Sequence, residues 1–232
     1  MPPHPLPWSY PLLMAASLAA GALLSRRGLK RAGLPPREST LLAFGAFFGA
    51  VIGAKATILF VDPRASWRVA DLLDGGKTIL GGILGGYFGV ELVKWARGIT
   101  VKTGDAYAVA VAASIAIGRL GCYVAGCCYG TPTRLPWGVD FGDGIARHPT
   151  QLYEAAFHGT MAVVLYRLGR AGRLRFQLMK LYILSYLLYR FATEYIRPEP
   201  RLWGALTGYQ VLAAAMVPLF VLLWVRDERA YG

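Results

Sequence analysis

Seven long apolar segments constrain the fold of this chain more than any other feature of its sequence. Each is close to the roughly 20 residues that an α-helix needs to cross a bilayer. Of the 232 residues, 55% are hydrophobic and 16% are charged, which is too apolar for an ordinary soluble domain. We therefore predict an all-α integral membrane protein with about seven transmembrane helices, near Trp8–Leu24, Leu41–Val61, Ile79–Ala96, Ala106–Tyr123, Leu152–Leu168, Gln177–Tyr195 and Thr207–Val225.

The basic residues gather in alternate connectors between these segments. No lysine or arginine precedes the first segment, whereas clusters follow the first, third, fifth and seventh: Arg26, Arg27, Lys30, Arg31 and Arg37; Arg97 and Lys102; Arg170, Arg173 and Arg175; Arg226 and Arg229. By the positive-inside rule, this predicts an N-terminus outside and a C-terminus in the cytoplasm. Five basic residues on the predicted outer side weaken the signal: Arg64, Arg68, Lys77, Arg134 and Arg147.

This distribution also bears on partners and domains. A net charge of +12 could indicate nucleic-acid binding, but charge confined to alternate connectors indicates contact with anionic lipid headgroups instead. We expect a membrane and no nucleic acid as the partner. We also expect residues 1–232 to form a single transmembrane domain, with residues 124–151 as an outer connector within it.

The sixth segment carries a stripe of polar residues. Tyr186, Arg190 and Glu194 are spaced four residues apart, and Arg197 follows, so on a helix the first three share one face. Charge inside a membrane span is costly and marks a functional site by default. The alternative is a structural intrahelical pair of Arg190 with Glu194, although buried ion pairs stabilise proteins weakly.

Threading the chain through the membrane in this orientation places most of its polar intramembrane residues near the outer interface. They are Tyr10, Lys55, Arg119, His148, Gln151, Tyr153, Glu154, Arg190 and Glu194. Arginine binds phosphate through two parallel hydrogen bonds and stays charged, so this level suits an anionic lipid headgroup. Blander alternatives remain: Lys55 snorkels to the interface, Tyr10 belongs to the aromatic belt, and Gly81 and Gly82 let helices approach closely.

Three sequence segments resemble a known family. Gly118–Thr133 reads GRLGCYVAGCCYGTPT, His148–Glu154 reads HPTQLYE, and the third combines Tyr186-x3-Arg190-x3-Glu194 with Arg197. Together with the stretch Gly49–Lys55 and the Thr207-x2-Gln210 pair, they resemble the signature segments of bacterial prolipoprotein diacylglyceryl transferases. The resemblance covers nearly the whole chain. It implies a multi-pass protein of the bacterial cytoplasmic (inner) membrane.

The resemblance implies a transferase that works without a cofactor. Members of that family move a diacylglyceryl group from phosphatidylglycerol to the lipobox cysteine of a prolipoprotein, and glycerol phosphate leaves. It implies catalytic roles for Arg119, Arg190, Glu194 and His148. Lipid or phosphate binding is expected of ten residues: Tyr10, Lys55, Gly81, Gly82, Gly130, Gln151, Tyr153, Glu154, Tyr186 and Arg197. An anionic phospholipid similar to phosphatidylglycerol, and a prolipoprotein substrate, are the expected partners.

The chain also departs from that family. Cys122 and Ala125 stand where the family has Asn, Cys127 where it has Glu, and Thr131 where it has Arg. Leu80 replaces a histidine that is essential there, and leucine cannot take a proton. Either another group substitutes, with His148 or Lys77 as the nearest candidates, or this chain does not perform the parent reaction and its acceptor side has been rebuilt.

All three cysteines fall at that altered place. Cys122, Cys127 and Cys128 are structural or inert, including a Cys122–Cys127 disulfide, or they are reactive thiols activated by Arg119. A metal site with His148 is the least favoured interpretation, because Cys-x4-Cys-Cys is not a usual zinc spacing, and we assign no metal. Two alternatives to the transferase therefore stay open: a membrane thiol redox protein, and a catalytically silent lipid-binding relative.

Overall fold

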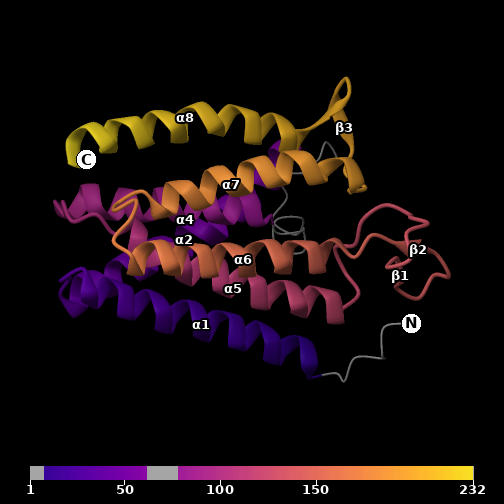
Figure 1. The fold of residues 1–232 in the computed structure, drawn as a ribbon, viewed down its shortest axis with the longest axis horizontal. Coiled ribbons are helices and arrows are strands. Elements are labelled where there is room, and N and C mark those ends of the chain that lie inside the picture. The colour runs from indigo at the N-terminus through magenta and orange to yellow at the C-terminus, as the bar shows by residue number, and fades with distance from the viewer. Residues whose placement is uncertain (1–7, 62–77, 232) are drawn as a thin grey trace. The chain divides into compact units, whose positions relative to one another are not determined.

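The computed structural model describes residues 8–61 and 78–231, and most of them are helical (Figure 1). The α-helices of these ranges are α1 (Ser9–Arg31), α2 (Pro36–Val61), α4 (Ile79–Arg97), α5 (Gly104–Val124), α6 (Thr150–Arg170), α7 (Leu178–Thr193) and α8 (Gly208–Tyr231). Two short hairpins pair β1 (Val139–Asp140) with β2 (Ala146–Arg147) and β3 (Arg201–Trp203) with β4 (Leu206–Thr207). A 3-10 turn, η1 (Glu194–Ile196), follows α7. Each predicted apolar segment coincides with one of these α-helices.

Five of the helices are long and apolar enough to cross a membrane: α1, the Pro36–Leu59 part of α2, α4, α5 and α8. The 16 residues of α7 are fewer than a span ordinarily requires, and the 21 residues of α6 do not meet the same criterion of length and composition. Large apolar side chains on α2 are exposed, among them Phe44, Phe48 and Ile52. Helices that contact lipid are expected to expose aromatic and aliphatic side chains of this kind. The chain is therefore a helical protein with several apolar helices of membrane-spanning length.

The chain divides into two compact units. The first comprises Met1–Gly28, Asp105–Leu178 and Tyr195–Pro198, and the second comprises Leu29–Gly104, Met179–Glu194 and Glu199–Gly232. The single transmembrane domain stays a prediction.

In the first unit, α1 packs against α5 through small residues. The Ser17 hydroxyl donates to the Ser114 carbonyl, and the Ser114 hydroxyl donates to the Ser17 carbonyl, each over 2.8 Å. A Cβ added to Gly21 would touch Ser114, and one added to Gly121 would touch Met14. Small residues and interhelical hydroxyl bonds are typical of helices that associate in membranes, where lipid removes most of the hydrophobic driving force.

In the second unit, α2 and α4 are antiparallel and approach closely along two rows of glycines. A Cβ on Gly85 would lie 2.2 Å from the carbonyl oxygen of Gly49, and a Cβ on Gly89 would lie 2.2 Å from that of Gly45. Gly81 faces the same partner, because its Cβ would lie 2.3 Å from the Gly53 oxygen. These distances leave no room for a side chain, so the glycines determine how closely the two helices pack.

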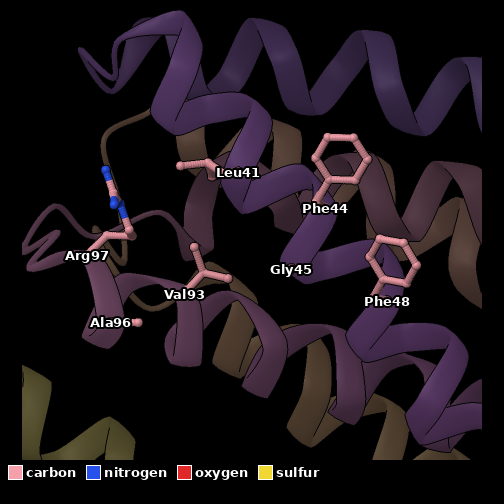
Figure 2. Close-up of a pocket in the computed structure, with 7 residues that line it drawn as sticks. All are labelled: Leu41, Phe44, Gly45, Phe48, Val93, Ala96 and Arg97. Atoms are coloured by element: carbon pink, nitrogen blue, oxygen red, sulfur yellow. The ribbon is translucent and has the colours of Figure 1, made fainter.

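A shallow apolar groove lies between the same two helices (Figure 2). Leu41, Phe44 and Phe48 of α2 border it, and Val93 and Arg97 contribute from α4. Among the described residues that line it, Arg97 is the only charged one, and none was predicted for the site. The groove is therefore separate from the predicted chemistry.

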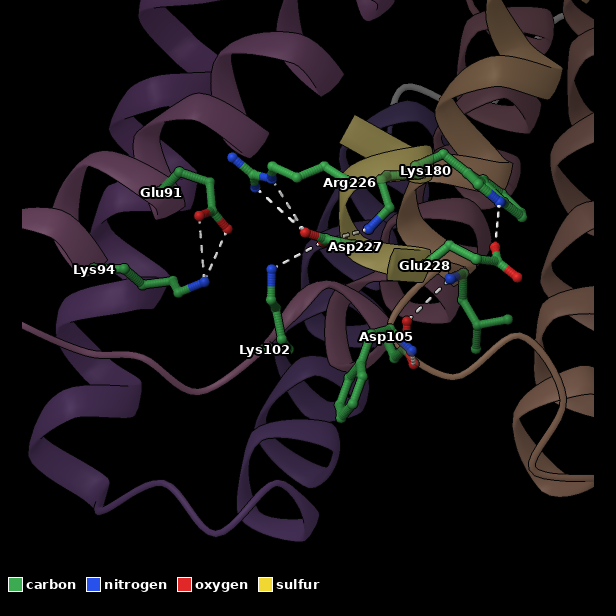
Figure 3. Close-up of polar contacts among 11 residues, drawn as sticks. Glu91, Lys94, Lys102, Asp105, Lys180, Arg226, Asp227 and Glu228 are labelled. Carbon is green, nitrogen blue, oxygen red and sulfur yellow. Dashed lines mark hydrogen bonds and ion pairs between the residues drawn. The ribbon is translucent and has the colours of Figure 1, made fainter. Parts of the chain in front are cut away.

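A second polar cluster joins helix ends of the same unit (Figure 3). Asp227 of α8 is buried and accepts from Lys180 over 2.8 Å and from Lys102 over 2.9 Å. Glu91 and Lys94 form a local pair with a 3.0 Å contact on α4. Each of these carboxylates thus has a cationic partner, and such pairing accounts for their place in or beside apolar helices.

Candidate functional site

Two arginines share one carboxylate in the first unit. Arg119, near the C-terminal end of α5, forms an ion pair with Glu154, near the N-terminal end of α6. Arg197 donates to the other oxygen of Glu154 over 2.7 Å. The relative exposures of the three residues are 8%, 1% and 9%. Two buried guanidinium groups therefore meet one carboxylate, and guanidinium groups bind phosphate through paired hydrogen bonds.

The backbone after α5 is fixed by side chains of the same network. The carbonyl oxygen of Cys128 accepts from the Thr150 hydroxyl over 2.8 Å and from Arg197 over 3.3 Å. The carbonyl oxygen of Cys127 accepts from the Gln151 amide. Thr150 and Gln151 are 1% and 0% exposed. The predicted binding residue Gln151 therefore holds the cysteine segment in place.

Gly130 ends this segment where the chain is crowded. A Cβ at this position would lie 2.5 Å from the carbonyl oxygen of Ile196 and 2.9 Å from the Cβ of His148. The Gly130 amide donates to the His148 carbonyl, and the Thr131 amide donates to the Ile196 carbonyl. Glycine is required here because three segments meet without room for a side chain.

The three thiols lie together beside Arg119. The sulfur atoms of Cys122, Cys127 and Cys128 are all within 4.8 Å of one another, and those of Cys127 and Cys128 are 3.7 Å apart. Hydrogen bonds from the Cys122 and Cys127 thiols, and then the Arg119 guanidinium, hold the pKa of Cys128 well below its usual range. The same contacts with Cys122 and Cys128 raise the pKa of Cys127. The cysteines are present as free thiols, and Cys128 is exposed.

The histidine motif lies at the start of α6. His148 Nδ1 is 3.4 Å from the Tyr153 hydroxyl, which accepts from the Trp137 indole over 2.8 Å. His148 also joins the turn through backbone bonds to Gly130 and Thr131. Its catalytic role stays a prediction, because these contacts identify a position and not a reaction.

Two groups of the second unit hold Arg190, and a third fixes its ion-pair partner. It forms a 3.0 Å ion pair with Glu194, and its guanidinium stacks over the Tyr209 ring at 4.5 Å. The other oxygen of Glu194 accepts from the Thr207 hydroxyl over 3.0 Å. Arg190 and Glu194 are 5% and 2% exposed, and the nearby Tyr186 is fully buried and stacks on Tyr189. Both the structural pair and a preorganised phosphate ligand are compatible with this arrangement.

Thr207, which donates a hydrogen bond to Glu194, was not among the residues that the sequence predicted for the site. The Thr207 hydroxyl accepts from the Gln210 amide, and the Gln210 side-chain oxygen accepts from the Thr207 amide. This reciprocal pair is a capping box at the start of α8. The Thr-x-x-Gln spacing was the signal that could have predicted it, and the cap fixes Thr207 where it meets Glu194.

The remaining predicted residues have different surroundings. Lys55 is half-buried on α2, and Tyr10 is 42% exposed on α1. Gly81 faces α2, whereas Gly82 has more room, with its nearest neighbours 3.8 Å from an added Cβ. Leu80 is buried, and Lys77, one suggested substitute for the family histidine, lies outside the described residues. Lipid binding by Lys55, Tyr10 and the two glycines stays a prediction.

Arg119 and Arg190 belong to different compact units, so their convergence on one anion also stays a prediction.

The outer connector contains an ordered acidic turn. One oxygen of Asp140 accepts from the amides of Gly142, Asp143 and Gly144. Asp143 pairs with Arg147 over 2.6 Å, and this hydrogen bond lowers the pKa of Asp143. Both carboxylates are therefore occupied with the structure of the turn.

Comparisons with known proteins identify relatives of this sequence. The family model described as prolipoprotein diacylglyceryl transferase matches residues 2–226. Proteins named phosphatidylglycerol–prolipoprotein diacylglyceryl transferase are similar in sequence. The one from Clostridium tetani is 30% identical over 84% of this chain and 82% of its own length. Those from Methylococcus capsulatus and Nitratidesulfovibrio vulgaris are 31% and 33% identical, over 92% and 95% of this chain and 88% and 89% of theirs.

The family model matches almost the entire sequence, a range that contains the positions of the arginine network, the histidine motif and the Arg190–Glu194 pair. The chain belongs to the prolipoprotein diacylglyceryl transferase family.

Proposed function

We propose that this chain transfers a diacylglyceryl group from phosphatidylglycerol, or a closely similar anionic phospholipid, to the cysteine thiol of a prolipoprotein. The observation that carries the proposal is the buried network in which Arg119 and Arg197 share Glu154. Its two guanidinium groups suit the phosphate of the donor lipid. The names of the relatives, phosphatidylglycerol–prolipoprotein diacylglyceryl transferases, support the same donor and acceptor.

The proposed reaction breaks a carbon–oxygen bond and forms a carbon–sulfur bond. The acceptor sulfur attacks the glycerol carbon that carries the phosphate ester, and glycerol phosphate leaves with the bonding electrons. Guanidinium groups accelerate such a step if they hold the departing phosphate more tightly as its charge grows. We assign this role to Arg119 and Arg190, with Glu154, Arg197, Glu194 and Tyr209 positioning them.

The proposal also covers the membrane topology. Seven spans, an external N-terminus and a cytoplasmic C-terminus would place Arg119, His148 and Arg190 near the outer surface of the bacterial cytoplasmic membrane. The alternation of basic connectors supports this orientation. At that depth the phosphate enters the protein while the acyl chains stay in the bilayer.

A transfer assay tests the proposal. The protein is reconstituted in vesicles with labelled phosphatidylglycerol and a lipobox peptide, and labelled peptide is measured. We expect Arg119→Ala and Arg190→Ala each to lower transfer by about 100-fold or more, as loss of one stabilising group does elsewhere. Arg147→Ala, which removes an arginine paired with Asp143 in the connector, is the matched control and should stay near the wild-type rate. Near-normal transfer by both test variants would contradict the proposal.

A further inference from the structure

The geometry of the cysteine cluster matches metal coordination. With zinc–sulfur bonds of about 2.3 Å, two ligands of a tetrahedral site lie about 3.8 Å apart. The sulfurs of Cys127 and Cys128 are 3.7 Å apart, and all three sulfurs lie within 4.8 Å of one another. Shifts of less than 1 Å, well within side-chain freedom, would bring all three to the same ion.

We propose that Cys122, Cys127 and Cys128 bind one Zn²⁺ ion as thiolates, and that its fourth position binds the thiol of the acceptor. Zinc sites with three protein ligands keep the fourth position for water or substrate. The metal site stands on the sulfur geometry alone, whereas the identity of the incoming thiol rests on the proposed function.

The segment that carries the thiols is preorganised. Cys128 has a φ of +63°, in the left-handed region that residues other than glycine rarely adopt. Its carbonyl is held by Thr150 and Arg197, and that of Cys127 by Gln151. The turn therefore brings two consecutive sulfurs together without relying on a metal, which removes the usual objection to vicinal cysteine ligands.

The charge and exposure of the surroundings also suit the site. Three thiolates with Zn²⁺ carry one net negative charge, and the Arg119 side chain hydrogen-bonds to Cys128. Cys122 and Cys127 are half-buried, whereas Cys128 is exposed. A thiol from outside can therefore approach the ion beside the arginine that we assign to the donor phosphate.

Such a site would provide the deprotonated acceptor thiol that the transfer reaction needs. When the acceptor thiol binds Zn²⁺, its proton leaves to solvent, and the bound sulfur is a thiolate at neutral pH. The sulfur then attacks the glycerol carbon, the carbon–oxygen bond to phosphate breaks, and the electron pair leaves with glycerol phosphate. The ion changes neither its charge nor its protein ligands. No protein base is required at position 80, where this chain has leucine and the family resemblance predicts a histidine.

Metal binding is tested on the full-length protein in detergent, reduced, freed of metal and titrated with Co²⁺ as a probe. Because the chain has three cysteines, thiolate-to-cobalt charge-transfer absorption can arise only from this cluster. We expect saturation at one Co²⁺ per chain, displacement by one Zn²⁺, and loss of the absorption in Cys122→Ser and Cys127→Ser. Asp143→Asn, which alters an exposed carboxylate, should bind as the wild type does.

Two results would overturn the metal site. One is a wild-type protein that takes up no Co²⁺ after reduction, for instance because a Cys122–Cys127 disulfide is its stable form. The other is cobalt absorption that persists in the serine variants. Because the first criterion uses the unaltered protein, misfolding of a variant cannot obscure the outcome.

The fourth position is tested by adding a lipobox peptide to the cobalt protein. Charge-transfer absorption should rise by about one third as sulfur ligands increase from three to four, and a serine peptide should cause no rise. In the transfer assay, chelation should lower the rate by about 100-fold or more, and Zn²⁺ but not Mg²⁺ should restore it. Transfer that survives chelation overturns the acceptor role but leaves the proposed function intact. A cysteine-specific rise without transfer under any condition contradicts the proposed function and supports the thiol site.

Discussion

At the residue scale, neutralisation of Glu154 is the change that we expect to destabilise the fold most. It is 1% exposed and pairs with both Arg119 and Arg197. Its neutralisation leaves two buried guanidinium groups near each other without their shared counter-charge. Removal of one partner from a buried ion pair typically costs about 3–5 kcal/mol.

We therefore predict that Glu154→Gln lowers the thermal unfolding temperature of the purified protein and abolishes transfer. The amide keeps the size of the side chain, so the change tests charge and not packing. Asp143→Asn is the matched control, because that carboxylate also pairs with an arginine but is exposed to solvent, where ion pairs contribute little. Equal stability of Glu154→Gln and the wild type would mean that the network does not depend on this charge.

The sequence predicted some of these residues much better than others. The spacing of Arg190 and Glu194 indicates contact directly, because residues four apart on a helix are neighbours. The contact persists although Glu194 lies in η1, just past the end of α7. By contrast, Arg119, Glu154 and Arg197 come from three segments far apart in the chain. The family resemblance indicated all three as site residues. No local pattern predicts that Arg119 and Arg197 both pair with Glu154.

At the element scale, the packing of α2 on α4 depends on glycines. An added Cβ at Gly85 would lie 2.2 Å from the Gly49 oxygen and 2.8 Å from the Gly53 Cα, both on backbone that cannot rotate away. The helices would have to separate, and overpacking of this kind typically costs about 1–3 kcal/mol.

We predict that Gly85→Ala lowers the thermal unfolding temperature, whereas Gly82→Ala, three residues earlier on the same helix, does not. An added Cβ at Gly82 has its nearest neighbours at 3.8 Å, which is ordinary contact. Both substitutions increase helix propensity equally, so the difference between them isolates the approach of α2. Similar unfolding temperatures for the two variants would show that the helices adjust without cost.

The helices were predicted more reliably than their ends. Apolar segments of about 20 residues indicate a helix in a membrane because the backbone must satisfy its own hydrogen bonds there. The observed helices extend further, since α1 continues to Arg31 and α8 to Tyr231. Arginine and lysine are good helix formers, so a helix can continue through basic residues beyond the apolar segment, and hydropathy does not detect this extension.

At the scale of the whole molecule, the residues proposed for the reaction come from both compact units. Arg119 and the thiols belong to the first unit, and Arg190 and Glu194 belong to the second. Hydropathy and the charge of the connectors predict a common depth for them, but they cannot predict contact. The proposed membrane orientation is therefore what predicts that the residues of both units lie at the same depth. It can be tested independently of activity.

The three cysteines make that test direct, because all of them lie in or next to the predicted outer connector and Cys128 is exposed. We predict that a membrane-impermeant maleimide labels the protein in spheroplasts treated with reductant and chelator. The matched control replaces all three cysteines by serine and adds Ala230→Cys, at an exposed position near the end of α8. This control should be labelled only after the membrane is opened, because basic residues at the end of α8 indicate the cytoplasmic side. The opposite pattern would place the thiols in the cytoplasm, where an exported prolipoprotein could not reach them, and would remove the acceptor role along with the orientation.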